Sequence, residues 1–305
     1  MANEKYEFNA KWVVQSGNKT WEPIGIAIDS TGNVYVSDWS ESLIYKFKSD
    51  GTIIEKIKVD SLVFRIAVDK FGKIYTTAHH EDNMKIYDSS GKLIDKWKIN
   101  LKDRGGGIAI DKNSFIYITN ASAVIKYSPD GKRIEKENKN ELESTSKDWF
   151  GTKSESTSIN HFETNMVQTT GIAIESNGNI FLTFVLTTAG RTLSGGIFKF
   201  SPDVEFIAHF PSAGNLNIQQ TYGLAIDDSD NLYVPDRFND RIVKLSSNGK
   251  VLSIWGSKGS MDGQFDEPFD IAVDRSGENV YVVDKDNKRV QKFCKTRSLL
   301  KKFWH

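Results

Sequence analysis

Gly223-Leu-Ala-Ile-Asp227 is one of six related motifs that recur along this chain of 305 residues. Each motif has a glycine or its substitute, an apolar–alanine–apolar core and a closing acid. The other five are Gly25-Ile-Ala-Ile-Asp29, Arg65-Ile-Ala-Val-Asp69, Gly107-Ile-Ala-Ile-Asp111, Gly171-Ile-Ala-Ile-Glu175 and Asp270-Ile-Ala-Val-Asp274. The central alanines stand at 27, 67, 109, 173, 225 and 272, so the steps are 40, 42, 64, 52 and 47 residues. A repeat of this length that is built from short strands predicts a β-propeller.

The segment from 222 to 256 shows how one repeat reads as four strands. Short apolar or alternating runs predict strands at 223–227, 232–235, 241–245 and 250–255. Asn248-Gly249, between the third and fourth runs, is typical of a hairpin turn. The other repeats follow the same order, with an aromatic residue in most second strands that we expect to pack between blades. The sequence therefore predicts an all-β fold, a six-bladed β-propeller of four-stranded antiparallel blades that is closed by a terminal strand.

A second pattern resembles a known family. Residues 263–274 read Gly-Gln-Phe-Asp-Glu-Pro-Phe-Asp-Ile-Ala-Val-Asp, and Asn279-Val-Tyr-Val-Val-Asp284 and Lys288-Arg-Val-Gln-Lys-Phe293 follow. This stretch, like 223–245, resembles the NHL repeat, and the resemblance extends over nearly the whole chain. It implies the six-bladed fold but not one activity, because propellers of similar architecture include interaction modules, RNA-binding modules and metal-dependent lyases and lactonases.

Composition narrows the function classes. Lys plus Arg and Asp plus Glu both number 40, so the net charge is zero, which argues against a nucleic-acid partner. Cys294 is the only cysteine, so no intramolecular disulfide forms. No apolar run is long enough for a membrane span, and the charged N-terminal residues show no apolar stretch of the kind that a signal peptide has. We expect a soluble monomer, cytoplasmic by default, whose residues 1–305 form one domain with a polar insertion at about 137–170.

Two segments could supply the closing strand of the ring. Tyr6–Val14 reads as a fourth strand without a blade of its own, and so does the basic segment 298–303. Both cannot lie antiparallel to the third strand of blade six. We favour the N-terminal segment, which leaves the C-terminal one as an added edge or a displaced tail.

Departures from the repeat suggest where a site lies. In a propeller, the loops before the first strand and after the second share one face, and function tends to lie on variable loops. The polar insertion and a longer loop within 184–196 both fall on this face, where Arg65 and Asp270 replace the motif glycine. Aromatic and arginine side chains are the usual anchors of interfaces. The predicted ligand- or partner-binding residues are Trp39, Arg65, Arg104, Trp149, Phe150, Tyr222, Arg237, Phe238 and Asp270.

These observations leave two functions open. The leading hypothesis is a non-catalytic binding module that takes a protein, a peptide or a small polar ligand on this face and needs no cofactor. The alternative is a divalent-metal-dependent lyase or lactonase-type hydrolase with its site in the central channel. Its weak metal-ligand candidates are His79, His80 and His161, since histidine is the usual ligand of catalytic zinc. No catalytic residue is assigned.

Overall fold

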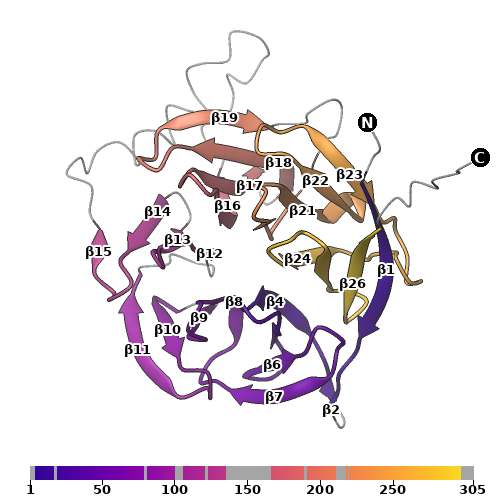
Figure 1. Cartoon of the computed structure of the whole chain (residues 1–305), viewed down its shortest axis with the longest axis horizontal. Coiled ribbons are helices and arrows are strands. Elements are labelled where there is room, and N and C mark those ends of the chain that lie inside the picture. The colour runs from indigo at the N-terminus through magenta and orange to yellow at the C-terminus, as the bar shows by residue number, and fades with distance from the viewer. Residues whose placement is uncertain are drawn as a thin grey trace, which may run out of the picture.

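The protein forms a ring of six antiparallel sheets around a central axis (Figure 1). The computed structural model describes residues 4–16, 19–78, 81–99, 106–120, 123–134, 166–188, 191–210, 218 and 220–296. Over these residues, each of the six sheets has four strands; five sheets follow sequence order from the centre to the rim, and the sixth takes β1 as its outer strand. The predicted six-bladed propeller of four-stranded blades is therefore confirmed.

The strands of the six blades have the following bounds. Blade one contains β4 (Pro23–Ile28), β5 (Val34–Asp38), β6 (Leu43–Phe47) and β7 (Ile53–Lys58). Blade two contains β8 (Val63–Val68), β9 (Ile74–Ala78), β10 (Asn83–Tyr87) and β11 (Leu93–Lys98). Blade three contains β12 (Ile108–Ile110), β13 (Ile116–Asn120), β14 (Ala123–Tyr127) and β15 (Arg133–Ile134). Blade four contains β16 (Met166–Ile174), β17 (Ile180–Thr188), β18 (Arg191–Phe200) and β19 (Phe206–Phe210).

Blade five contains β20 (Ala225–Ile226), β21 (Leu232–Asp236), β22 (Arg241–Leu245) and β23 (Val251–Trp255). Blade six contains β24 (Pro268–Val273), β25 (Asn279–Asp284), β26 (Arg289–Thr296) and, from the other end of the chain, β1 (Lys5–Trp12). A short hairpin of β2 (Gln15–Ser16) and β3 (Lys19–Thr20) precedes blade one, and the 3₁₀ turn η1 (Arg237–Asn239) follows β21. No helix in the described part of the chain is long and apolar enough to cross a membrane.

The second strand of most blades carries a buried tyrosine that explains the acid of the repeated motif. The hydroxyl of Tyr35 donates a hydrogen bond to Asp29 at 3.2 Å, and Tyr233 donates to Asp227 at 2.9 Å. Tyr75 and Tyr117 make the same bond within their blades. The rings pack in the core between sheets, as the sequence predicted. Burial raises the pKa of these tyrosines, and the neighbouring carboxylates raise it further.

The motif glycine allows the inner strands to approach each other at the channel. A Cβ atom on Gly25 would lie 2.7 Å from the carbonyl oxygen of Phe64 in blade two, and one on Gly223 would lie 2.5 Å from Oδ1 of Asp270 in blade six. Cβ atoms do not approach other atoms this closely, so a side chain here would push neighbouring blades apart. The inner strands contact one another in order around the ring, and β24 contacts β4.

The N-terminal strand closes the ring. β1 pairs antiparallel with β26, with Lys5 opposite Thr296 and Trp12 opposite Val290. This confirms the N-terminal segment as the closing strand, while residues 297–305 lie outside the described residues. In Figure 1, β1 covers the outer edge of blade six.

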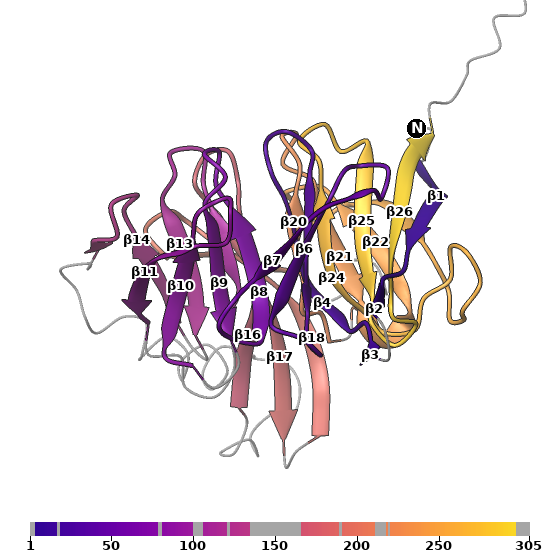
Figure 2. The same ribbon diagram turned by 90° about the horizontal axis from the view of Figure 1, so that it is seen from below.

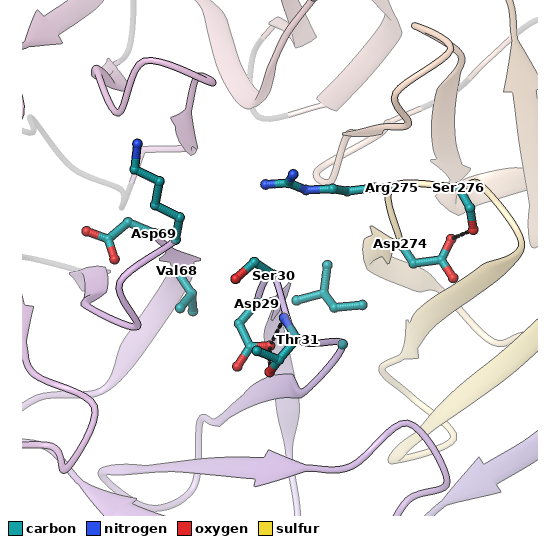
Figure 3. A pocket seen from close by; sticks show the side chains of 11 residues that line it. Asp29, Ser30, Thr31, Val68, Asp69, Asp274, Arg275 and Ser276 are labelled. Carbon is teal, nitrogen blue, oxygen red and sulfur yellow. Dashed lines mark hydrogen bonds between the residues drawn. The ribbon is translucent and has the colours of Figure 1, made fainter.

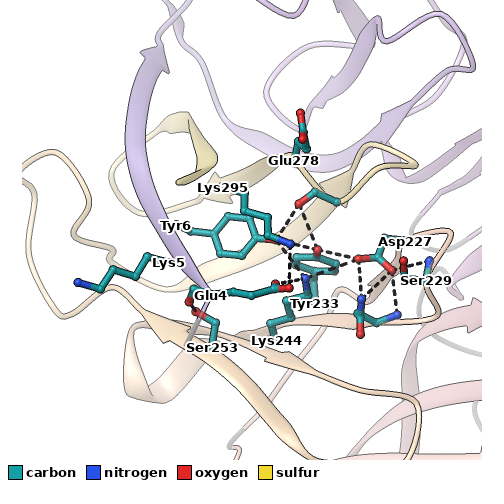
Figure 4. A network of polar contacts seen from close by, with 12 residues as sticks. Glu4, Lys5, Tyr6, Asp227, Ser229, Tyr233, Lys244, Ser253, Glu278 and Lys295 are labelled. Carbon is teal, nitrogen blue, oxygen red and sulfur yellow. Dashed lines mark hydrogen bonds and ion pairs between the residues drawn. The ribbon is translucent and has the colours of Figure 1, made fainter. Parts of the chain in front are cut away.

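A polar network also fastens β1 to blade five (Figure 4). The Tyr6 hydroxyl lies 2.9 Å from that of Tyr233 and donates to the carbonyl of Gly277 at 2.7 Å. The ammonium of Lys244, whose side chain is 1% exposed, lies 2.5 Å from Glu4. Glu4 also accepts a hydrogen bond from Lys295 at 2.8 Å. The strand is thus held by buried side chains as well as by its backbone.

Blade four differs from the others in strand length. β16, β17 and β18 contain 9, 9 and 10 residues, and β17 and β18 stay paired as far as Thr188 and Arg191. Figure 2 shows these three strands projecting beyond the other blades on one face of the ring. The longer loop predicted within 184–196 is wrong, because strand pairing continues as far as Thr188 and Arg191. Met166–Thr170, which the sequence placed in the insertion, begin β16, and residues 137–165 lie outside the described residues.

Candidate functional site

A row of stacked aromatic side chains crosses the channel on the face where the longer strands of blade four project. Trp39 lies edge-on to Phe64 with 6.0 Å between ring centroids, and Phe64 lies edge-on to Phe269 at 5.8 Å. Phe269 stacks on Tyr222 at 4.7 Å. We call these four residues, with Arg237, the aromatic row. It joins blades one, two, six and five, which are far apart in the sequence.

Arg237 ends the row in blade five. Its guanidinium carbon lies 5.3 Å from the ring centroid of Tyr222 and 5.6 Å from that of Phe238. The same guanidinium forms an ion pair with Glu267 and donates to Oε1 of Gln220 at 3.0 Å. These contacts fix the arginine, and cation–π attraction adds to its hold on the rings.

Below the row, Arg65 spans the channel. It starts on blade two, and its NH2 group donates to the carbonyl of Tyr222 on blade five at 2.7 Å. Its NH1 group lies 3.0 Å from Oδ2 of Asp270 on blade six. Its guanidinium carbon also lies 4.7 Å from the centroid of the Phe64 ring. The two residues that replace the motif glycine therefore form one buried ion pair in the channel.

Asp270 is held from several sides. Its Oδ2 accepts a hydrogen bond from the backbone of Ile26 at 3.1 Å, and its Oδ1 accepts one from the backbone of Ile271 at 3.0 Å. Burial raises the pKa of Asp270, while Arg65 and these two N–H groups oppose that rise. With its oxygens engaged and its charge matched by Arg65, this carboxylate has little left to offer a ligand.

The predicted binding residues thus divide into a buried and an exposed group. Arg65, Tyr222 and Asp270 are at most 9% exposed and support the face from beneath. Trp39 is half-buried, and Phe238 is 46% exposed. Phe269, which the sequence places among the aromatic residues of this face, and Phe64, which was not predicted, complete the row. The place of Phe64 at the start of an inner strand, next to Arg65, is the signal that could have identified it.

Several predicted residues lie outside the described residues, namely Arg104, Trp149, Phe150, His79, His80 and His161. Their roles stay predictions. Within the part of the chain that the structure describes, no group of three histidine, cysteine, aspartate or glutamate side chains is placed to hold a metal ion.

A pocket of about 410 Å³ opens at the opposite mouth of the channel (Figure 3). Its walls are the turns between the first and second strands of blades one, two and six. The lining residues are Ile28, Asp29, Ser30, Thr31, Gly32, Val68, Asp69, Lys70, Asp274, Arg275 and Ser276. We call it the turn pocket. Sequence reasoning missed it because it examined only the other face, although each turn begins with the acid of the repeated motif.

Comparisons with known proteins agree with this architecture. The NHL repeat model matches residues 265–293. NHL repeat-containing protein 3 of Homo sapiens is 33% identical over 75 residues, which are 24% of this chain and 21% of the human protein. The match thus spans about a fifth of the length of that curated relative.

Solved structures match over nearly the full chain at low identity. A streptogramin B lyase structure is 14% identical with a TM-score of 0.60, and the match covers 96% of this chain and 98% of that one. XC5397 of Xanthomonas campestris, described as a gluconolactonase, is 12% identical with a TM-score of 0.60, over 92% of this chain and 88% of that one. Likeness at this identity shows the fold alone. Together with the repeated motif and the six blades, these matches show that the chain is a six-bladed β-propeller that carries an NHL repeat at residues 265–293.

Proposed function

We propose that this propeller is a non-catalytic binding module that takes a protein or peptide on the aromatic row. The observation that carries the proposal is the continuous row from Trp39 to Arg237, with Phe238 exposed beside it. Tryptophan, tyrosine and arginine dominate the energetics of interfaces when rigid neighbours hold them. Here the buried Phe64, Phe269 and Tyr222 provide that support. A ligand would meet a preorganised surface rather than order one on binding.

The occupied channel favours this proposal over the metal-dependent alternative. A divalent ion at the channel centre would lie where the guanidinium of Arg65 already lies, and the two cations would repel each other. The Asp270 carboxylate, which could otherwise bind the ion, is paired with that guanidinium at 3.0 Å. Chemistry at this face would need residues other than those of the aromatic row.

Peptide selection tests the proposal without a known partner. The full chain would be used to select binders from a displayed library of random linear peptides, and affinities would be measured by biolayer interferometry. Trp39→Ala and Phe238→Ala should each weaken the selected peptides by about tenfold or more, the loss expected for an anchor residue. Phe71→Ala is the matched control, since Phe71 is 73% exposed and follows the first strand of blade two, at the other mouth.

The outcomes distinguish the two functions. Peptides that bind the Trp39 and Phe238 variants as tightly as the unchanged chain would remove the aromatic row from the site, as would a failure to enrich any peptide. Turnover of a lactone that depends on added zinc or calcium, and that survives Phe238→Ala, would support the hydrolase instead.

A further inference from the structure

The turn pocket presents two kinds of polar group with different availability. Three aspartates line it, and each closes the first strand of its blade. The residue that directly follows each of these aspartates, namely Ser30, Lys70 and Arg275, also lines the pocket and carries a donor side chain. If the carboxylates are free, the pocket can bind a cation. If the donor side chains are free, it can bind an anion.

The aspartates are occupied by their own turns. Asp29 accepts hydrogen bonds from the backbone and hydroxyl of Thr31 at 2.9 and 2.6 Å, from the backbone and amide of Asn33 at 3.0 Å each, and from Tyr35 at 3.2 Å. These five donors use the four or so lone-pair sites of a carboxylate. Asp69 and Asp274 accept equivalent bonds within their own blades. These bonds leave the three aspartates little capacity to ligate a cation.

The donors are not occupied. Within the described residues, the side chains of Ser30, Lys70 and Arg275 have no hydrogen bond or ion pair, and all three are exposed. The Lys70 ammonium has only the ring of Phe71, 5.2 Å from its centroid, beside it. In Figure 3, Arg275 points across the opening, whereas Asp274 points away from it. The lining of the pocket therefore includes a guanidinium, an ammonium and a hydroxyl that form no hydrogen bond or ion pair with other described side chains.

The equivalent turn positions of the neighbouring blades add to this pattern. The residue after the closing acid is Lys112 in blade three and Asp228 in blade five. Lys112 extends the basic arc beyond Lys70, whereas Asp228 lies beside blade six and donates its backbone N–H to the carbonyl of Arg275 at 2.9 Å. Neither residue lines the turn pocket, and the basic side chains at this mouth come from blades two, three and six.

We propose that the turn pocket binds the phosphate group of a small phosphomonoester. Arg275 supplies the planar fork that matches phosphate oxygens, Lys70 supplies a point charge, and Ser30 supplies a neutral donor from the blade between them. Arg275 and Lys70 bring two positive charges to a phosphate dianion, whereas the three aspartates of the lining add negative charge and would oppose its binding. A volume of about 410 Å³ falls within the range of small-molecule sites and leaves room for a body attached to the phosphate. This site is separate from the aromatic row.

Calorimetric titration of the full chain tests the proposal. The probes are inorganic phosphate and glycerol 1-phosphate, in a phosphate-free buffer of low ionic strength, with acetate as a monoanion of similar size. Arg275→Gln and Lys70→Gln should each weaken both phosphates by about tenfold, because each removes a charge-assisted hydrogen bond. Lys132→Gln, an exposed lysine in a turn of blade three, should leave the affinity unchanged. Tighter binding of glycerol 1-phosphate than of inorganic phosphate would identify the attached body as part of the ligand.

Three results would overturn the proposal. They are the absence of binding at millimolar phosphate, an equal loss in the Lys132 variant, and acetate binding as tight as phosphate binding. Melting temperatures serve as a second readout, since a ligand that binds only the folded chain raises them. Phosphate should raise the melting temperature of the unchanged chain and not that of the Arg275 variant. Both variants lie at exposed positions, so they should fold normally.

Discussion

Arg65 and Asp270 replace the motif glycine in blades two and six, and they form contacts that glycine cannot make. At four blades the motif glycine leaves room for the neighbouring inner strand, as the 2.7 Å and 2.5 Å approaches at Gly25 and Gly223 require. At the other two blades the replacements point into the channel and meet each other. Breaking such a buried pair costs far more than the pair contributes, because the remaining charge stays desolvated.

Arg65→Met should therefore destabilise the fold strongly. It removes the partner of Asp270 and the hydrogen bond to the carbonyl of Tyr222, so we expect the free energy of unfolding to fall by about 3–5 kcal/mol. Arg65→Met combined with Asp270→Asn should recover part of this loss, since no buried charge remains. Urea unfolding of the three chains measures both effects. If the free energy of unfolding of Arg65→Met lay within about 1 kcal/mol of that of the unchanged chain, a structural role for the pair would be contradicted.

At this scale the sequence identified the residues but not their contacts. It placed Arg65, Asp270, Tyr222 and Arg237 on one face because each occupies a known position in the repeat. It could not show that Arg65 reaches Tyr222, 157 residues away, because which side chains meet across the channel depends on how the six blades close. The turn pocket escaped notice for a related reason, since its unpaired donors become evident only when the bonds of each aspartate are known.

Among the elements, β1 is held in place by side-chain contacts as well as by its backbone hydrogen bonds to β26. Lys244 is buried beneath it and bonds to Glu4 at 2.5 Å and to the Tyr6 hydroxyl at 3.2 Å. The ion pair of Lys11 with Asp262 also links β1 to the segment between blades five and six, at 2.7 Å, but both side chains are about half exposed. Comparing the buried Lys244–Glu4 pair with the exposed Lys11–Asp262 pair therefore shows how much burial adds to the stability that such a contact provides.

Lys244→Met should cost about 1–3 kcal/mol of unfolding free energy, since it leaves buried acceptors without their donor. Lys11→Met should cost less than about 1 kcal/mol, as exposed ion pairs do. Thermal or urea unfolding of both variants gives the comparison. Equal losses would mean that the buried network contributes no more than the surface pair.

The same network predicts a pH dependence. Burial alone would raise the pKa of Glu4, but its hydrogen bonds with Lys244 and Lys295 and their charges outweigh burial and lower the pKa below 4.5. The unfolded chain then takes up a proton first as the pH falls, so this stabilisation is present above pH 4.5 and is lost as the pH falls through the lowered pKa. Glu4→Gln should flatten that part of the stability curve. Identical slopes in the two chains below pH 4.5 would contradict the assignment.

Strand order was predictable at this scale, whereas strand length was not. In each blade, the repeated motif predicts the first strand, the aromatic run predicts the second, and the hairpin glycine marks the turn between the third and fourth. Tyr6–Val14 could be favoured as the closing strand because apolar side chains without a blade of their own need a sheet to cover. The extension of β17 and β18 lacked such a signal, since Thr187-Thr-Ala-Gly-Arg191 reads equally well as a loop.

The ring as a whole is closed by strands from opposite ends of the chain. The last blade without β1 would present β26 as an open edge, which invites pairing with a second chain. Removal of residues 1–12 should therefore lower the melting temperature and produce dimers or larger species, as measured by size-exclusion chromatography with light scattering. A monomer of unchanged melting temperature would show that β1 is dispensable.

A rearranged chain provides the control for that truncation. Because Lys5 lies opposite Thr296, residues 5–12 can follow Thr296 through a two-residue Asn-Gly turn and still pair with β26 in the same register. This chain should remain monomeric and recover most of the lost stability. Failure to recover would mean that the position of the strand in the sequence matters beyond its contacts.

The position of Arg65 in the channel also has a consequence for the two proposed sites. Arg65 and Asp270 pair inside the channel, and the turn pocket and the aromatic row share no lining residue. If both proposed sites are real, a substitution at one mouth should leave binding at the other unchanged. The ring would then act as an adaptor with two independent faces, one for a small anion and one for a peptide.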